Sequence, residues 1–359
     1  MGIDFGAAGI KVVELKSVKK RPVLVTYGLA PTEVGIHGLI SAVSALPSGA
    51  SLSGTAKVAE DYYVAVVKKL CKVSKVKSKF VMASLPSTAV YSELVTMPHL
   101  NKDEFNHVIN AELRKLLPRP IEEMSLDYQI LPSADKNSEV RRVLVNAVFK
   151  NVVGLYTRIF SRAGLKLQVL EPEQVALARS LVGNDQSLSL VVDIGAERTN
   201  FFMVENAVAV NHHSLEIGGD KILSLAQAQW NLDDAAGACL IADLMEYLNN
   251  DKKASNVSAD FLNVCQSVSD PLVKEIKYGL DLFLQQVGNE NKRVEKIILS
   301  GGAARLPGFS AYLADRFQLK CYLGDPWSRV VYPDSLRPLL GSVGPRLAVS
   351  IGLALRNVL

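Results

Sequence analysis

The 359-residue chain has few of the residues that mark disulfide-bonded, zinc-binding or redox proteins. It has four cysteines, and no two of them have the spacing of a zinc or thiol redox site (Cys71, Cys239, Cys265 and Cys321). Each lies among apolar residues, so we expect reduced, buried and unreactive thiols in a cytosolic protein. The five histidines show no ligand spacing with Asp, Glu or Cys, and we assign no metal to them.

Long apolar runs are also missing. No run approaches the roughly 20 apolar residues needed to cross a bilayer. The chain opens directly in a predicted strand, so we expect no signal peptide, and Gly6 stands where a myristoylation signal has Ser or Thr. The sequence therefore predicts a cytoplasmic protein with no membrane span of its own.

Neither basic nor acidic residues are in large excess. The net charge is +4, which is mild for this length and does not predict nucleic-acid binding. Basic residues do cluster locally at 16–21 and 68–79. Two interpretations of these clusters stay open: solvated turns with a polar helix face, or an anionic membrane surface nearby. With 48% hydrophobic and 21% charged residues, the chain is globular and long enough for two or more subdomains.

One short sequence motif occurs twice. An apolar strand, then Asp-x-Gly, then a tight turn and a second apolar strand appear at 2–15 and again at 191–204. The two aspartates, Asp4 and Asp193, lie about half the chain apart. Each copy opens a predicted three-stranded meander followed by helices, which indicates an internal duplication.

The residues of this motif favour binding of a polyphosphate. Glycine permits backbone conformations in which the amides of a turn point at an anion, and the aspartate would lie near a metal on that anion. Two such hairpins facing each other would grip a nucleoside polyphosphate from both sides. One copy alone would be weak support, because Asp-x-Gly is common in ordinary hairpins.

Hydrophobic periodicity and turn residues predict the remaining elements. Asn101 and Glu104 form a capping box that begins a helix, and Pro118 ends it. We expect strands at 1–5, 10–16, 22–29, 79–85, 89–97, 125–131, 140–148, 165–170, 188–193, 199–205, 207–214 and 294–300. We expect helices at 56–72, 102–117, 151–163, 171–181 and 341–357, a helical region from 218 to about 287, and loops at 47–54 and 132–138.

The two hairpins, the joining helix and a late Ser300-Gly301-Gly302 together resemble the actin-like ATPase superfamily. Residues 300–308 resemble its adenosine motif, in which paired glycines let a base and ribose lie against bare backbone. Within the superfamily, residues 215–220, 300–308 and 351–356 resemble the PilM family of type IV pilus assembly proteins. A terminal amphipathic helix after a linker, usual in the related FtsA proteins, is not found, which favours PilM.

The resemblance implies an α/β, ribonuclease H-like duplicated fold with two lobes around a nucleotide cleft and an FtsA-type inserted subdomain. It implies a first lobe core at 1–86 completed by the helix at 341–359. It also implies an insert at 87–168 and a second lobe at 169–340 with a helical subdomain at about 217–291.

The same resemblance implies ATP and Mg²⁺ as ligands, with the metal held by Asp4 and Asp193 through its waters. Lys11 would reach a phosphate oxygen, and Glu275 and Lys277 would meet the nucleoside. The implied nucleotide-binding residues are Asp4, Gly6, Ala7, Ala8, Gly9, Lys11, Asp193, Gly195, Ala196, Thr199, Asn200, Gly218, Gly219, Glu275, Lys277, Gly301, Gly302, Ala303 and Arg305.

Ordinary structural roles remain open for several of these residues. The aspartates could bond their own turns, Lys11 could be a solvated strand lysine, and Gly218–Gly219 could form a plain helix entry. Glu275 and Lys277 could lie on a solvated helix face.

Both hairpins also depart from the family pattern. The first has Ala7, Ala8 and Gly9 where the family usually has hydroxyl residues. The second has Glu197, which is unfavourable beside phosphates unless Arg198 neutralises it. We therefore expect nucleotide binding in which a hydroxyl contact is missing.

Hydrolysis needs a polar residue on the joining helix to orient water, and Glu171 and Gln174 are the nearby candidates. Glu171 could equally cap that helix. We expect slow turnover or none, with the nucleotide acting as a structural ligand or switch.

The family resemblance implies a cytoplasmic scaffold at the inner face of the membrane. It would dock the N-terminal tail of a PilN-like membrane protein near 89–97 and 102–117 and meet other inner-membrane platform proteins. Self-association stays open, as do an FtsA-like divisome filament, a type II secretion component, a sugar or acetate kinase and an actin-fold chaperone.

Overall fold

The structure is a computed structural model, and it describes residues 1–47, 49–131, 140–231, 233, 259–286, 289–305 and 309–358. The chain forms two compact units, each described by itself below. Unit 1 contains Met1–Glu14 and Val25–Glu173, and unit 2 contains Leu15–Leu24 and Gln174–Leu359. The predicted loop at 132–138 and the residues from 234 to 258 lie outside the described residues.

The first sheet has the strand order β3-β2-β1-β4-β8. β1 and β2 form the predicted hairpin, and β1, β4 and β8 run parallel. Helices α1, α2 and α4 bury their apolar faces in one core with β1, which includes Phe5, Tyr63, Tyr156 and Phe160. The bounds are β1 Gly2–Gly6, β2 Gly9–Val18, β3 Arg21–Ala30, α1 Ile36–Ser44, α2 Gly54–Val73, β4 Phe80–Leu85, α4 Lys150–Arg162 and β8 Lys166–Pro172.

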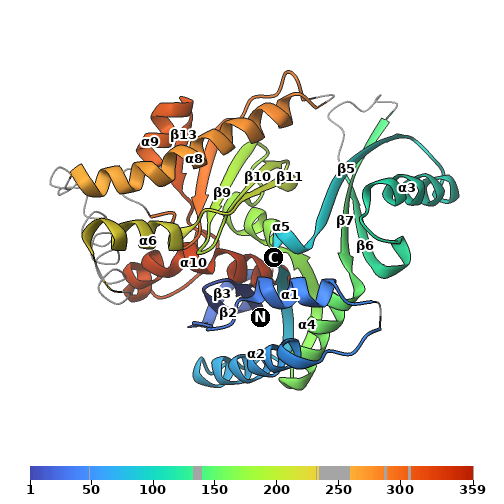
Figure 1. The fold of residues 1–359 in the computed structure, drawn as a ribbon, viewed down its shortest axis with the longest axis horizontal. Helices are drawn as coiled ribbons and strands as arrows, with labels where there is room; N and C mark the ends of the chain where they lie inside the picture. Colours follow the sequence, from blue (N-terminus) through green and yellow to red (C-terminus); the bar gives the residue numbers. More distant parts are fainter. Residues whose placement is uncertain are drawn as a thin grey trace. The chain divides into compact units, whose positions relative to one another are not determined.

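A smaller three-stranded sheet, ordered β5-β7-β6, lies within unit 1 between β4 and α4 in the sequence. Helix α3 covers one of its faces through Phe105, Ile109 and Leu113 (Figure 1). The predicted capping box is confirmed, because the backbone amides of Asn101 and Glu104 each donate to the other's side chain at 3.1 and 3.0 Å. The bounds are η1 Ser87–Ala89, β5 Tyr91–Pro98, α3 Lys102–Leu116, η2 Ile121–Glu123, β6 Met124–Ile130 and β7 Val140–Phe149.

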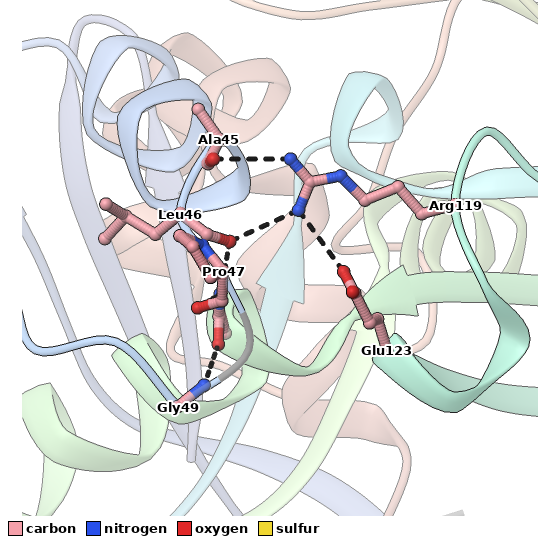
Figure 2. A network of polar contacts seen from close by, with 7 residues as sticks. Ala45, Leu46, Pro47, Gly49, Arg119 and Glu123 are labelled. Carbon is pink, nitrogen blue, oxygen red and sulfur yellow. Dashed lines mark hydrogen bonds and ion pairs between the residues drawn. The ribbon is translucent and has the colours of Figure 1, made fainter.

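Arg119 ties this small sheet to the end of α1 (Figure 2). Its guanidinium donates to the carbonyls of Leu46 and Ala45 at 3.2 and 3.3 Å and pairs with Glu123 at 3.4 Å. Asn151 at the start of α4 donates to the same Leu46 carbonyl at 2.9 Å. The carbonyls at the end of a helix lack partners within it, so these side chains satisfy them while joining three elements of unit 1.

The second sheet repeats the topology of the first, with the order β11-β10-β9-β12-β13. Again an antiparallel meander is followed by parallel strands on the side of the first strand. The predicted duplication and α/β fold class are therefore confirmed. The bounds are β9 Ser189–Ile194, β10 Thr199–Glu205, β11 Val208–Leu215, β12 Lys296–Ser300 and β13 Lys320–Leu323.

Helix α10 belongs to unit 2 and is largely buried. Leu340 and most residues from Gly344 to Leu355 are buried, and the backbone of Ala176 lies so close to Gly352 that a Cβ there would be 1.9 Å from its oxygen. The stretch Asp334–Leu355 is long and apolar enough to cross a membrane, but 67% of its most apolar window is buried in the protein. Among the residues that the structure describes, the helices after β8 are α5 Glu173–Leu177 with η3 Ala178–Val182, α6 Gly219–Trp230, α8 Ala259–Leu284, α9 Phe309–Phe317, and η5 Asp334–Leu336 with α10 Arg337–Leu355.

The structure differs from the sequence expectations in a few places. The predicted strands are present within two residues at each end, but α1, α9 and β13 had no prediction. Cys71 and Cys321 are half-buried rather than buried, and partial burial raises the pKa of their thiols to about 11 and about 12. Both stay protonated and unreactive near neutral pH. Cys239 and the side chain of Cys265 lie outside what the structure describes.

Candidate functional site

The first hairpin site consists of the turn between β1 and β2 and the end of β4. Asp4 lies in the buried part of β1 and is 4% exposed. Its Oδ2 pairs with Nζ of Lys11, directly opposite on β2, at 3.0 Å, and its Oδ1 accepts from Oγ of Ser84 on β4 at 2.7 Å. Both carboxylate oxygens are therefore engaged by side chains of neighbouring strands.

Glycine makes this arrangement possible. A Cβ on Gly6 would lie 2.2 Å from Nζ of Lys11, so the lysine folds over bare backbone to reach Asp4. Gly9 has φ +138°, and a Cβ there would lie 2.3 Å from the carbonyl oxygen of Ala30. Ala7 and Ala8 form the turn between them.

The row of polar residues continues to β8, where Glu171 pairs in register with Ser84. Glu171 is buried and belongs to this strand. The prediction that it lies on the joining helix is wrong, because β8 continues to Pro172 and the helix begins at Glu173. Gln174 does lie on that helix, α5, and is buried. The carboxylate of Glu173 accepts from the amide of Ser87 at 2.9 Å.

The second hairpin site starts from the equivalent row in unit 2. Asp193 at the end of β9 pairs in register with Asn200 on β10 and with Ser300 on β12. Asp193 is half-buried, while Asn200 and Ser300 are buried. Within the described residues, Oγ of Ser300 has no hydrogen-bond partner. Ser300 was predicted as part of the adenosine motif. Ser84, which holds the equivalent position in the first sheet, was not predicted as a site residue.

Backbone hydrogen bonds hold three turns together at this site. The amide of Gly195 closes the hairpin on the carbonyl of Arg198 at 2.9 Å. The first amides of α6, from Gly219 and Asp220, donate to the carbonyls of Gly195 and Ala196, both at 2.9 Å. Ala303, in the turn after β12, donates to the carbonyl of Ile194 at 3.1 Å. The hairpin, the start of α6 and the turn after β12 thus form one backbone assembly.

Two glycines allow this close approach. A Cβ on Gly218 would lie 2.3 Å from the carbonyl oxygen of Ala196. Gly301 has φ +92°, and a Cβ there would lie 2.2 Å from the carbonyl oxygen of Ile194. Gly302 is different, since it is exposed and a Cβ there would meet only the side chain of Arg346 at 3.6 Å.

Several side chains of this site are tied to the protein itself. Oγ1 of Thr199 donates to the carbonyl of Ile217 at 2.7 Å. The guanidinium of Arg198 contacts Ser214 at 3.0 Å and Glu216 at 2.7 Å, so its partners include groups other than the expected Glu197. Burial, with a smaller contribution from Glu197, raises the pKa of Asp220.

The remaining predicted residues lie on other elements of unit 2. Glu275 on α8 contacts the ring of His213 on β11, and Lys277 is exposed on the same helix. Arg305 donates to the carbonyl of Ser342 at 3.0 Å. In the part of the chain that the structure describes, no three His, Cys, Asp or Glu side chains form a metal-binding cluster.

A family model for type IV pilus assembly protein PilM matches residues 2–358. The chain belongs to the PilM family. Among solved structures, it is similar to a PilM-PilN type IV pilus biogenesis complex, with 23% identity and a TM-score of 0.77. That match covers 100% of this chain and 98% of the other.

A second similar structure is the ethanolamine utilization protein EutJ from Carboxydothermus hydrogenoformans. It has 14% identity and a TM-score of 0.53, and the match covers 99% of this chain and 88% of that one. These likenesses concern the fold alone. With the duplicated sheets, they confirm that this PilM-family chain has the actin-like fold implied by its resemblance to the superfamily.

Proposed function

We propose that the chain is an ATP-binding scaffold of type IV pilus assembly that docks the tail of a PilN-like membrane protein. Family membership over nearly the whole chain carries this proposal. The similar solved structure is a complex of PilM with PilN, which supports a partner of the same kind here. Attachment through that partner would hold the chain at the inner face of the cytoplasmic membrane, within reach of other platform proteins.

The second hairpin site supports the nucleotide part of this proposal. Glycine-bearing turns meet at the carboxyl ends of β9 and β12, beside the half-buried carboxylate of Asp193 and the buried hydroxyl of Ser300. Bare, exposed backbone at Gly302 suits the approach of a nucleoside, and Mg²⁺ favours carboxylate oxygens through its own waters. Asp193 would hold the metal in this way, and these residues fit the ligand.

The first hairpin site fits the same ligand less directly. Lys11 already neutralises Asp4 at 3.0 Å, so a metal near Asp4 requires the lysine to turn toward a phosphate oxygen. Mg²⁺ would supply charge neutralisation for the phosphates when bound, Asp4 would hold it through its waters, and Lys11 would orient a phosphate oxygen. The buried Glu171 and Gln174 are the groups that could orient a water, and we expect turnover below about 1 s⁻¹, the low end for ordinary enzymes.

Isothermal titration of the full chain with Mg-ATP tests the nucleotide part. We expect measurable binding by the wild type and its loss in Asp193→Asn. Asp185→Asn is the control. Asp185 also belongs to unit 2, but its exposed carboxylate pairs with Lys296 at the start of β12, away from the hairpin. Absence of heat with the wild type at high micromolar protein would contradict ATP binding.

The tail-binding part concerns the small sheet of unit 1. Strand β5 is an edge strand, so an extended tail can add to it, and apolar side chains of the small sheet and of α3 are exposed. Tyr91 on β5 and Leu116 on α3 are 40% and 48% exposed. Helix α4 packs in the main core of unit 1, so deleting 87–168 would remove core side chains, and point variants are the better test.

The probe is a synthetic peptide of the cytoplasmic N-terminal tail of the cell's PilN-like protein. We expect Tyr91→Ala with Leu116→Ala to weaken its binding at least about tenfold, since each buried apolar side chain contributes on the order of 1 kcal/mol. Leu339→Ala, which removes a 49% exposed leucine on α10, is the matched control. Equal loss in both variants, or none in either, would contradict docking at this sheet.

A further inference from the structure

A run of lysines in unit 1 is not explained by either part of the proposed function. Residues 68–79 contain six lysines and no Asp or Glu. They run from the last turns of α2 through the connecting turn to the start of β4. All six lysines are exposed (Lys68, Lys69, Lys72, Lys75, Lys77 and Lys79).

The helix itself directs three of these lysines outward. Tyr63, Val67 and Leu70 of α2 are buried in the core of unit 1. In an α-helix, residues three or four apart share a face, so Lys69 and Lys72 lie away from this buried stripe. Lys68 follows the buried Val64 by four residues and lies at the edge of the stripe, where it is exposed. The exposed Asp61 lies two turns earlier on α2, but Arg162 pairs with it at 2.5 Å and compensates its charge.

The connecting turn presents its lysines from an ordered backbone. The buried carboxylate of Glu14 accepts from the amides of Lys77 and Ser78 at 2.8 and 2.9 Å. Oγ1 of Thr26 donates to the carbonyl of Ser74 at 2.7 Å. Both carboxylate oxygens of Glu14 are therefore engaged by the backbone of this turn, and the lysine side chains of the turn are exposed.

Two large apolar side chains stand among these charges. Val73 is 70% exposed, and Phe80, which begins β4, is 52% exposed. Phe80 pairs in register with Lys166, an exposed lysine that begins β8. We call Lys68, Lys69, Lys72, Lys75, Lys77, Lys79 and Lys166 with Val73 and Phe80 the lysine face.

The lysine face lies at the opposite end of the sheet from the first hairpin site. β1, β4 and β8 run parallel, with Phe80 and Lys166 at their beginnings and Asp4, Ser84 and Glu171 toward their ends. A large surface in contact with the lysine face would therefore leave the turn between β1 and β2 uncovered.

We propose that the lysine face binds the anionic phospholipid surface of a membrane directly. Clusters of four to eight Lys or Arg attract anionic headgroups, with each basic residue contributing to the affinity. Exposed Phe and Val flanked by lysines can enter the headgroup boundary, which favours a lipid surface over nucleic acid. This contact is independent of both ATP and the tail of a membrane partner, and it would orient unit 1 toward the bilayer.

Co-sedimentation of the full chain with vesicles tests the proposal without nucleotide or partner. The probes are vesicles of phosphatidylcholine mixed with phosphatidylglycerol, and vesicles of phosphatidylcholine alone. We expect binding to the anionic vesicles that weakens as salt is added, because exposed charges are screened over a Debye length of about 10 Å at 0.1 M salt. In Lys69→Gln/Lys72→Gln/Lys75→Gln, binding should fall by about 100-fold, since each lysine contributes roughly fivefold.

The matched control is Lys57→Gln/Lys274→Gln/Lys320→Gln, which removes the same charge from exposed lysines elsewhere. It should bind close to the wild type, and Phe80→Ser should reduce the binding that persists at higher salt. Equal loss in both triple variants, equal binding to neutral vesicles, or lysine-dependent binding of a duplex DNA without vesicle binding would each overturn the proposal. Circular dichroism confirms that each variant is folded.

Discussion

The two hairpin sites share a strand order and a register, yet they hold their aspartates differently. Asp4 is buried between Lys11 and Ser84, and both of its oxygens are engaged. Asp193 occupies the equivalent place in the second sheet, but it is half-buried and its neighbours in register are Asn200 and Ser300. One backbone plan therefore supports a buried aspartate in one unit and a half-buried aspartate in the other.

The glycines of the two sites also differ in use. In the first site, Gly6 leaves room for a side chain, the ammonium of Lys11. In the second, Gly218 and Gly301 let backbone approach backbone, and main-chain hydrogen bonds join three turns. Gly9 also lets backbone approach backbone in the first site, so the sites differ chiefly in what Gly6 makes room for and in the three turns joined in the second. This difference can be tested by substitution.

The largest effect should come from Gly301→Ala. Its added Cβ would meet the backbone of Ile194 at 2.2 Å, and its φ of +92° disfavours any L side chain. Because backbone cannot yield easily, we expect a loss of about 3 kcal/mol in the free energy of unfolding. Gly302→Ala, with only a side chain at 3.6 Å, should cost well under about 1 kcal/mol.

Urea unfolding followed by tryptophan fluorescence measures this effect in unit 2, because Trp230 and Trp327 both belong to that unit. Equal stability of the two alanine variants would show that main-chain approach does not hold the second site.

Acid should weaken the second meander through His212 on β11. Burial, together with His213 and Arg198, lowers the pKa of His212 from 6.5 to about 4. Between pH 6.5 and 4 the unfolded chain binds a proton at His212 that the folded chain does not. The free energy of unfolding is therefore highest above pH 6.5 and falls as the pH drops toward 4. The loss should reach about 2–3 kcal/mol.

This loss is measured as the difference in unfolding free energy between wild type and His212→Phe over that pH range. The first meander, residues 2–30, contains no histidine, so it lacks this response. His107→Asn, at an exposed histidine of unit 1, is the control. A pH dependence that is the same in His212→Phe and wild type would refute the assignment.

Exchanging Asp4 and Asp193 for asparagine compares the two carboxylates directly. Asp4→Asn leaves the 15% exposed ammonium of Lys11 without its counter-charge, so we expect a loss of about 2 kcal/mol in stability. Asp193→Asn should cost under about 1 kcal/mol and act on ligand binding instead. Chemical denaturation of both variants gives the comparison, and a larger stability loss at Asp193 would reverse it.

The smallest contrast concerns the paired serines. Ser84→Ala removes a buried hydrogen bond to Asp4 and should cost about 1 kcal/mol. Ser300→Ala removes a buried hydroxyl that has no partner in the described part of the protein, so it should be neutral or slightly stabilising. Differential scanning calorimetry resolves the two, and equal shifts in Tm would mean that Ser300 has a partner of similar strength.

Much of the fold could be predicted because its patterns are local. The alternation of apolar residues marks the strands, and Asn101 with Glu104 marks the start of α3. The hairpins around Asp4 and Asp193 were found from Asp-x-Gly between apolar strands. Helix α1 had no prediction, and the joining helix was placed two residues early, because β8 continues through Glu171 and Pro172.

The partners of the site residues could not be predicted in the same way. Ser84 lies 80 positions from Asp4, and nothing in its local sequence indicates that parallel pairing of β1 with β4 brings the two together. Thr199 was expected near phosphate, but its hydroxyl is bonded to Ile217. Glu275 was expected near a nucleoside, and it contacts His213 across two elements.

The sequence alone determined the duplication, the strand and helix order and the positions of the glycine turns, because short-range periodicity and backbone freedom are written in neighbouring residues. Only the tertiary structure decided how each aspartate is used. Burial, counter-charge and hydrogen-bond partners at these sites come from strands that are distant in the chain and meet only when the sheets form.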